Sequence, residues 1–515
     1  MKQSVFKWHH RAAWIAGVAA LLWGLSGLSH PIMVWLSPRP ASFSTPVWPL
    51  ELGGAQAPGA IMEGAGISSA VEVRAVRTGP EAAKTANDYY LIREGADGPR
   101  RYFNPQTGAE QPDGDRMRAE ALARYYSGDQ SSPIKSADYL TQHTADYPAN
   151  NPLLPVWRVV FDRSDRITVY VDTGSGRLAT IGNRKRDAIL TVFTNVHTMS
   201  FLPAGAEWAR VMLIGLLIGS LFAAAVLGLG LLILLRARRK ATMDRKWHRI
   251  LAHAAVIPAL MFSSSGLYHL LHASTLLSAA PSVVPQTRFS ASELLGLKGD
   301  DMAAMAQTHA ATQAVTGLSA ARSEAGDLVW RVALAAPQQS AGHSALAHAH
   351  HGAMPDQVMS AAKALPTALW IKGDSGALME NAAQDIARAL ATKAIGLGEN
   401  RIVSMDQVHG FTPEYGFLNK RLPVWRVAFD DPETPLLFVD AADAVVAATV
   451  SKADVREGKF FNTIHKWSFL DWMGQKPRDV VIMSFVALIV LTSLFGWVTQ
   501  IRRIRQSGTQ RKKSP

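Results

Sequence analysis

The stretch "KWHHRAAWIAGVAALLWGLSGLSH" occupies residues 7–30, and a similar stretch, "KWHRILAHAAVIPALMFSSSGLYH", occupies residues 246–269. Both are apolar runs with a histidine near each end. A helix from His9 to His30 is about 31 Å long at 1.5 Å per residue, and the hydrocarbon core of a bilayer is about 30 Å thick. Each stretch therefore predicts a helix that crosses a membrane and holds a histidine near each face.

Two further apolar stretches, at 208–235 and 478–500, reach the length of about 20 residues that a bilayer-spanning helix needs. With 12–36 and 250–272 they give four expected transmembrane helices. Hydrophobic residues make up 48% of the 515-residue chain and charged residues 18%, which is more apolar than a typical soluble protein. The first span is expected to remain as an anchor, because no A-x-A signal-peptidase site follows it.

The formal net charge of +12 is concentrated in three segments that together hold 16 basic residues and one acidic residue. These are the N-terminus 1–11, the linker 236–249 and the tail 501–515. Positive segments stay in the cytoplasm. The long segments 37–207 and 273–477 are therefore expected in the periplasm of a bacterial inner membrane. The basic charge is a topology signal, and no nucleic-acid partner is expected.

The chain repeats itself in two registers. In the first, Lys7, Trp8, His9, Ser26, Gly27 and His30 recur at constant spacing in 246–269. In the second, "LPVWRV" at 154–159 matches 422–427, and "VHTMSFL" matches "IHKWSFL", which pairs His197 with His465. The chain therefore consists of two copies of one unit, each with a span, an outer segment, a histidine and a second span. Both copies have the same membrane orientation, as in a parallel repeat.

The outer segments carry a weaker repeat. Strands around Trp157, Trp330 and Trp425 are each followed by another strand that ends in an Asp-containing turn. The alternation of apolar and polar residues predicts small antiparallel sheets with a packed helix, two α+β modules in each outer segment. The three tryptophans are expected in the cores of these modules.

Histidine is the residue type that most directly suggests a function. Nine of the 16 histidines lie in or beside the spans, where ionisable side chains are costly and usually functional. They are His9, His10, His30, His197, His248, His253, His269, His272 and His465. The alternative is that they merely occupy the headgroup zone, but three repeat-related pairs favour a ligand role.

Two interpretations of such histidines are open. A b-type haem needs two facing imidazoles and no cysteine, and the chain has no cysteine for iron–sulfur clusters or c-type haem. A bare metal path is the alternative, since histidine also binds zinc, copper and iron. Small residues near the ligands, such as Ser26, Gly27 and 263–266, leave room for a macrocycle or permit close helix contact.

The "WHR…SGLYH" helices, the "VHTMSFL" and "IHKWSFL" segments and modules of the form "VWRV…VYVDTGSGRL" resemble the PepSY-associated transmembrane family. This family includes the ferric-siderophore reductases of pyoverdine and ferrioxamine uptake. The resemblance implies four transmembrane helices in two parallel repeats, two periplasmic α+β PepSY-like domains and b-type haem, two groups being expected. The implied ligands are His30, His197, His269 and His465 near the outer face and His9 and His248 near the inner face. His10 and His253 are the alternatives for the inner positions.

The segment 341–355, "AGHSALAHAHHGAMP", interrupts the second outer segment. It has no periodic apolar face and is expected to be a flexible loop. Its histidines are candidate metal ligands, with a low-complexity insertion as the alternative interpretation. These candidates are His343, His348, His350 and His351.

The function expected from these observations is transmembrane electron transfer to periplasmic ferric-siderophore iron. No Gly-rich dinucleotide motif is present on the cytoplasmic side, so membrane quinol or a partner protein is the expected electron donor. Periplasmic iron-uptake proteins, the phospholipid membrane and a second copy of the chain are the further partners considered. Two other functions are kept as alternatives: a non-catalytic membrane module that binds a periplasmic protein, and a transporter of a metal or chelate.

Overall fold

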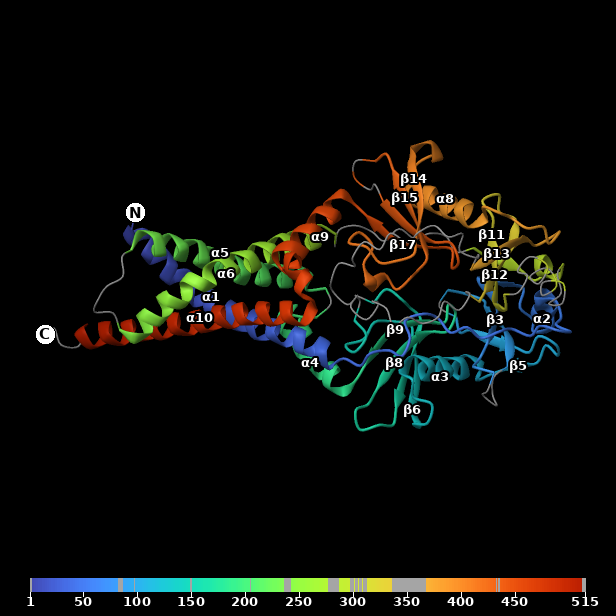
Figure 1. Ribbon diagram of the computed structural model, residues 1–515, viewed down its shortest axis with the longest axis horizontal. Helices are drawn as coiled ribbons and strands as arrows, with labels where there is room; N and C mark the ends of the chain where they lie inside the picture. Colours follow the sequence, from blue (N-terminus) through green and yellow to red (C-terminus); the bar gives the residue numbers. More distant parts are fainter. Residues whose placement is uncertain are drawn as a thin grey trace.

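The computed structural model describes residues 2–81, 87–96, 98–148, 151–203, 205–235, 242–276, 287–296, 301, 304, 308, 313–335, 367–431, 433 and 436–511. A helical bundle carries both chain ends at one tip, and the β-sheets gather at its other end (Figure 1). We call these the terminal end and the sheet end of the bundle.

Four helices form the bundle, and each is long and apolar enough to cross a membrane, as the sequence predicts. They are α1 (Lys2–Leu36), α5 (Glu207–Leu234), α6 (Met243–Leu276) and α10 (Gln475–Arg511). Helices α1 and α6, the first helix of each copy, both pack against α5 and α10. Close packing depends on small residues: a Cβ on Gly17 would lie 2.1 Å from Nε1 of Trp497.

Each copy contains a four-stranded antiparallel sheet and a covering helix, so α+β modules accompany the membrane helices. The first copy has α3 (Gly114–Ser127), β6 (Ile134–Leu140), β7 (Val156–Phe161), β8 (Thr168–Asp172) and β9 (Arg177–Gly182). The second has α8 (Ala382–Ile395), β14 (Ile402–Val408), β15 (Val424–Phe429), β16 (Leu436–Asp440) and β17 (Val445–Val450). The strand registers repeat as well, since Tyr139 pairs with Trp157 and Gln407 pairs with Trp425.

A seven-stranded sheet joins the two copies, in the order β13-β12-β11-β2-β3-β4-β5. Its strands are β2 (Glu72–Arg77), β3 (Asp88–Arg93), β4 (Arg101–Phe103), β5 (Glu110–Gln111), β11 (Val315–Arg322), β12 (Leu328–Leu334) and β13 (Ala368–Lys372). The join is the antiparallel pair β2–β11, in which Ala75 lies opposite Leu318. The sequence predicts separate modules in the two outer segments, whereas strand pairing unites the segments in the structure. Without this pairing, β2 and β11 would be unpaired sheet edges.

Short elements complete this region. They are α2 (Pro58–Gly64), the paired strands β1 (Ser69–Ala70) and β10 (Phe289–Ser290), and the 3-10 helices η1 (Ser292–Leu295), η3 (Glu399–Arg401), η4 (Phe417–Asn419) and η5 (Ser468–Met473). Trp330 is fully buried in the core of the central sheet, as expected. Trp157 and Trp425, on interior strands of their sheets, are only partly buried and pack against the cores of their modules; the indole N–H of Trp157 donates to Asp115 at 2.5 Å.

A cluster of buried charges lies where the three larger sheets meet. Glu72 and Asp172 both bind the guanidinium of Arg100, at 3.2 and 2.9 Å. Asp443, from the turn after β16, accepts from Arg74 on the central sheet at 2.8 Å. Further arginines bind Asp443 from both copies, namely Arg177 and Arg421. The Asp-containing turns that the sequence repeats therefore fasten the modules to the central sheet.

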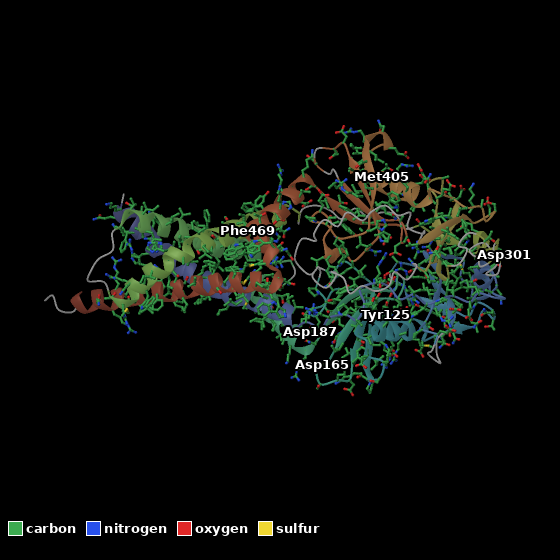
Figure 2. All side chains as sticks on the ribbon, viewed as in Figure 1. Tyr125, Asp165, Asp187, Asp301, Met405 and Phe469 are labelled. Carbon is green, nitrogen blue, oxygen red and sulfur yellow. The ribbon has the colours of Figure 1, made fainter. Side chains whose placement is uncertain are left out.

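Two helices lead from the modules back to the bundle: α4 (Arg184–His197) packs on α1, and α9 (Lys452–Ile464) packs on α6 (Figure 1). Ser451 caps α9 in a capping box with Asp454. The backbone takes a positive φ two residues after His197, which ends α4, and two residues after His465, which follows α9: at Met199 (53°) and at Trp467 (52°). These turns lead towards the following membrane helices. Phe469, in the 3-10 helix η5 that follows Trp467, lies at the sheet end of the bundle (Figure 2).

Candidate histidine sites of the helical bundle

His9 on α1 and His248 on α6 form a pair at the terminal end of the bundle, with ring centroids 6.5 Å apart. His9 Nδ1 lies 3.1 Å from the carbonyl oxygen of Ala224 on α5. His248 Nδ1 lies 2.8 Å from the carbonyl oxygen of Thr492 on α10. Ala224 and Thr492 are equivalent positions in the second repeat register. The two copies therefore make the same contact once each.

These contacts fix the protonation of both imidazoles. A carbonyl oxygen only accepts hydrogen bonds, so Nδ1 of each ring carries the proton and donates it. Nε2 then keeps the lone pair with which a neutral imidazole binds a metal. Metal-bound histidines usually donate their other ring N–H to an oxygen acceptor in this way. In this tautomer, Nε2 of His9 and of His248 remains available to bind a metal.

The separation of the two rings would allow both imidazoles to bind one metal; the rings of the adjacent His9 and His10 lie at a similar distance, 6.3 Å. A histidine nitrogen lies about 2.0–2.1 Å from its metal and about 1.1 Å from its ring centre, which places two opposed ring centroids about 6.3 Å apart. The observed centroid separation is 6.5 Å.

Two glycines make room for these rings. A Cβ on Gly228 of α5 would lie 3.3 Å from Cε1 of His9, and a Cβ on Gly496 of α10 would lie 3.1 Å from Cε1 of His248. Each glycine stands four residues after the carbonyl that its histidine binds. Gly228 and Gly496 are again equivalent positions, so the space beside each ring is a repeated feature.

At the sheet end, His197 and His465 make a repeated contact, one in each copy. His197 Nδ1 lies 3.0 Å from Oγ of Ser26, and His465 Nδ1 lies 2.9 Å from Oγ of Ser265. Each serine hydroxyl donates its single proton to a carbonyl of its own helix, at 2.7 Å for Ser26 and 2.8 Å for Ser265. The serine oxygen is therefore the acceptor from Nδ1, and Nε2 keeps its lone pair in these two histidines as well.

Burial keeps both sheet-end histidines neutral. It lowers the pKa of His197 to about 4, with a smaller contribution from the neighbouring His30. Burial likewise lowers the pKa of His465 to about 3, and among the neighbouring charges His197 contributes most. His269 and His30 also act on His465. The four predicted outer histidines therefore lie close enough to influence one another electrostatically.

A phenylalanine separates the two sheet-end histidines of each copy. The ring of Phe193 is stacked on His197 at 4.6 Å and lies 5.2 Å from the ring of His30. Phe461 takes the same place in the second copy, 4.4 and 4.8 Å from the two histidines of that copy. Each phenylalanine therefore contacts both sheet-end histidines of its copy.

His269 and His272 differ from their first-copy counterparts because they bind carboxylates of α9. His269 Nδ1 lies 2.8 Å from Oε1 of Glu457, and His272 Nε2 lies 2.6 Å from Oδ1 of Asp454. The position equivalent to Glu457 in the first copy is Ile189. The two copies thus surround their sheet-end histidines with different charge.

The remaining candidates lie apart from these pairs. His10, the alternative to His9, lies beside Gln500 and Arg503 of α10, whereas His9 has the contacts that match those of His248. His253 is exposed and places Nδ1 2.7 Å from the carbonyl oxygen of Arg249 in its own helix. Among the histidines of 1–11, His9 is therefore the structural equivalent of His248.

Some small residues predicted to leave space have another role in the structure. Ser26 and Ser265 orient histidines, and Ser263 and Ser264 bond to carbonyls of their own helix. A Cβ on Gly27 would meet no atom of the described chain within 4 Å. The space beside the rings at Gly228 and Gly496 was not predicted from the sequence. The equivalence of these two glycines in the second repeat register could have indicated it.

The predicted metal-binding histidines of the loop 341–355 lie outside the described residues. Within the described residues, no group of three or more histidine, aspartate or glutamate side chains is placed to hold a metal ion.

We compared the chain with protein-family models and with curated proteins. No family model matches it, and no curated protein matches it.

Proposed function

We propose that this protein is a haem-containing oxidoreductase that carries electrons across a bacterial inner membrane. The observation that carries the proposal is the repeated pair His9 and His248, with its 6.5 Å ring separation and its two Nδ1–carbonyl contacts. The second pair, His197 and His465, supports it at the other end of the bundle. Two sites in one bundle are what electron transfer across a membrane needs.

We assign one b-type haem to each pair. His9 and His248 would hold the haem at the terminal end, and His197 and His465 the haem at the sheet end. The residues fit this group, because each Nδ1 is bonded to oxygen, each Nε2 keeps its lone pair, and Gly228 and Gly496 leave space at the first pair. His30 and His269 are assigned to the surroundings of the sheet-end haem, each in contact with the phenylalanine of its copy.

A bound haem supplies reversible one-electron chemistry at iron, with a potential tuned by its axial ligands and surroundings. The chain's own residues orient the imidazoles and keep the sites apart. The α1 segment from His9 to Ser26 is about 25 Å long at 1.5 Å per residue, so the two sites lie towards opposite ends of the bundle. The apolar helices between them exclude water.

We place the terminal end of the bundle in the cytoplasm and the sheets in the periplasm. The basic linker and tail support this orientation, since positive segments remain in the cytoplasm. The repeated four-stranded modules and their Asp-containing turns support a relationship to the PepSY-associated transmembrane family. From this relationship we take the substrate class, which is ferric-siderophore iron. The proposed electron donor is membrane quinol or a partner protein.

The haem content of purified variants tests the two-site assignment. Purified full-length protein from haem-replete cells is expected to bind two haems by pyridine assay. His9→Ala and His248→Ala are each expected to lose the terminal-end haem, and His197→Ala and His465→Ala the sheet-end haem. His253→Ala is the matched control, because this exposed histidine of α6 bonds within its own helix.

The expected pattern is one remaining haem in each pair variant and two in the control. Wild-type protein without haem would contradict the proposed function. Equal haem content in all five variants would contradict the assignment of these pairs.

A further inference from the structure

We infer that a groove on the second copy binds an anionic iron(III) chelate with apolar or aromatic arms. The inference rests on the proposed function, because it names the place where the substrate of that function would bind. The groove has a volume of about 540 Å³ and lies between the sheet β14–β17 and the first turns of α9. Ligand pockets commonly have volumes of about 300–1,000 Å³.

The groove combines an apolar lining with positive charge. Phe429 and Leu436 contribute apolar lining and are largely buried, and Val455 of α9 adds a third apolar side chain. Lys452 and Arg456 are exposed and stand one turn apart on α9. Such a lining suits a ligand with a negative charge and an apolar body.

The two cations of α9 are unpaired within the described chain. Arg426, also in the groove, is paired with Glu414 at 3.4 Å. No ion pair forms between either Lys452 or Arg456 and any described acidic residue. Like charges four residues apart on a helix repel each other. The fold therefore leaves two adjacent positive charges that an anionic ligand would neutralise.

The first copy keeps only part of this chemistry at the equivalent place, since Arg184 takes the position of Lys452 and Arg158 that of Arg426. The position equivalent to Arg456 is Ala188, and that equivalent to Val455 is Asp187, which pairs with Arg186 at 2.9 Å. Asp187 lies on the first copy's side of the molecule, away from the second module (Figure 2). The sheet, the helix and the cation at the start of the helix are repeated, whereas the second exposed cation, Arg456, and the apolar Val455 beside it are particular to the second copy.

The groove also lies at a useful position relative to the proposed haem site. Helix α9 begins at Lys452 in the groove and is followed directly by His465. From Arg456 to His465 the helix is about 14 Å long at 1.5 Å per residue. A chelate in the groove would therefore lie one short helix from a histidine that we assign to the sheet-end haem.

A redox-inert chelate tests this binding independently of electron transfer. We would titrate full-length protein in detergent with the gallium(III) complex of a hexadentate tris-catecholate, which carries three negative charges, by isothermal titration calorimetry. The comparison ligand is the gallium(III) complex of a linear tris-hydroxamate with a free ammonium group, which carries one positive charge. Wild-type protein is expected to bind the anionic complex more tightly.

Variants locate the site. The double variant Lys452→Gln and Arg456→Gln is expected to weaken binding of the anionic complex by about tenfold or more, since two charge contacts are lost. Val455→Asp, which introduces the acid of the first copy, is expected to weaken it as well. Arg184→Gln is the matched control. It removes the cation at the first-copy position equivalent to Lys452, outside the groove, and should leave binding of the anionic complex unchanged.

Undetectable binding to wild-type protein, or equal binding by wild type, the double variant and Val455→Asp, would overturn the inference. So would a preference for the cationic complex. Gallium binding needs no haem, so this test can fail while haem is present and succeed while haem is absent. Failure of the groove and failure of the proposed function are therefore distinguishable.

Discussion

His9 and His248 come from different copies of the repeat, yet their rings lie 6.5 Å apart with both Nδ1 atoms bonded to equivalent backbone carbonyls. The relationship depends on the arrangement of the bundle, in which α1 and α6 each pack between α5 and α10. One copy alone supplies only one histidine and one carbonyl of the site. Duplication of the unit is thus what creates a facing pair.

The serines at the sheet end are expected to strengthen ligand binding by His197 and His465. Ser26→Ala or Ser265→Ala removes the acceptor for Nδ1, and loss of such a partner typically weakens metal binding by about 10–100-fold. We therefore expect faster haem loss to apomyoglobin and a shifted midpoint potential for the sheet-end haem. Ser264→Ala is the control, because this hydroxyl bonds only within its own helix at 3.1 Å. Unchanged haem retention in both serine variants would argue against this role.

Gly174 is expected to be essential for stability because the charged cluster leaves no room for a side chain. A Cβ there would lie 2.6 Å from both Nη2 of Arg100 and Oε1 of Glu72. Gly174→Ala should destabilise the protein by about 1–3 kcal/mol, as overpacking usually does. Thermal unfolding of full-length protein measures the effect. Gly53→Ala, where a Cβ would meet nothing within 4 Å, should be nearly neutral.

Asp443 is expected to be the most sensitive acid of the buried cluster. Burial raises the pKa of Asp443, but the guanidinium groups of Arg177, Arg74 and Arg421 outweigh this and hold it well below its usual range. The charge of Asp443 therefore stabilises the fold fully at pH values above the pKa of an aspartate in the unfolded chain, about 3.9. This stabilisation is lost as the pH falls from there through the lower pKa of Asp443 in the folded protein. Asp443→Asn should cost about 3–5 kcal/mol near neutral pH, because it leaves buried arginines uncompensated.

The pH dependence of the free energy of unfolding tests whether Asp443 stabilises the fold through its charge. Chemical unfolding of wild type and Asp443→Asn between pH 2 and 7 should give a difference that is constant above about pH 4 and shrinks as the pH falls below it. A difference that stays constant over this range would show that Asp443 stabilises the fold by packing rather than by charge.

Lys420 is expected to make stability rise with pH in the alkaline range. Burial, with a smaller effect of the charge on Arg186, lowers the pKa of Lys420 to about 7. A lysine in the unfolded chain has a pKa of about 10.4. At pH values between the folded and the unfolded pKa, Lys420 is protonated in the unfolded chain but not in the folded protein. The free energy of unfolding should then rise by up to about 1.4 kcal/mol per pH unit from this residue. Lys420→Gln should remove this contribution, and identical pH profiles for variant and wild type would contradict the prediction.

The sequence predicted the parts of the site that side chains and spacing reveal. Four apolar stretches gave the four membrane helices, and the repeat registers identified His9, His248, His197 and His465 as related pairs. Ser26 was noticed as a small residue, but not as a hydrogen-bond partner, since its role depends on how α4 packs against α1. The carbonyl of Ala224 carries no sequence signal, because every residue has one.

Long-range strand pairing was the main feature that the sequence did not predict. The join between β2 and β11 places Ala75 opposite Leu318, and no local pattern marks which sheet edges meet across so much of the chain. The cluster around Asp443 follows from the same join, because its arginines come from both copies. Repetition shows which residues are equivalent, but not which of them touch.

The absorption spectrum of the purified full-length protein, oxidised and then reduced with dithionite, tests the central claim most directly. We predict a Soret band that shifts on reduction and sharp α and β bands typical of bis-histidine b-type haem, with about half of the absorbance lost in His9→Ala. A colourless preparation from haem-replete cells would contradict the account.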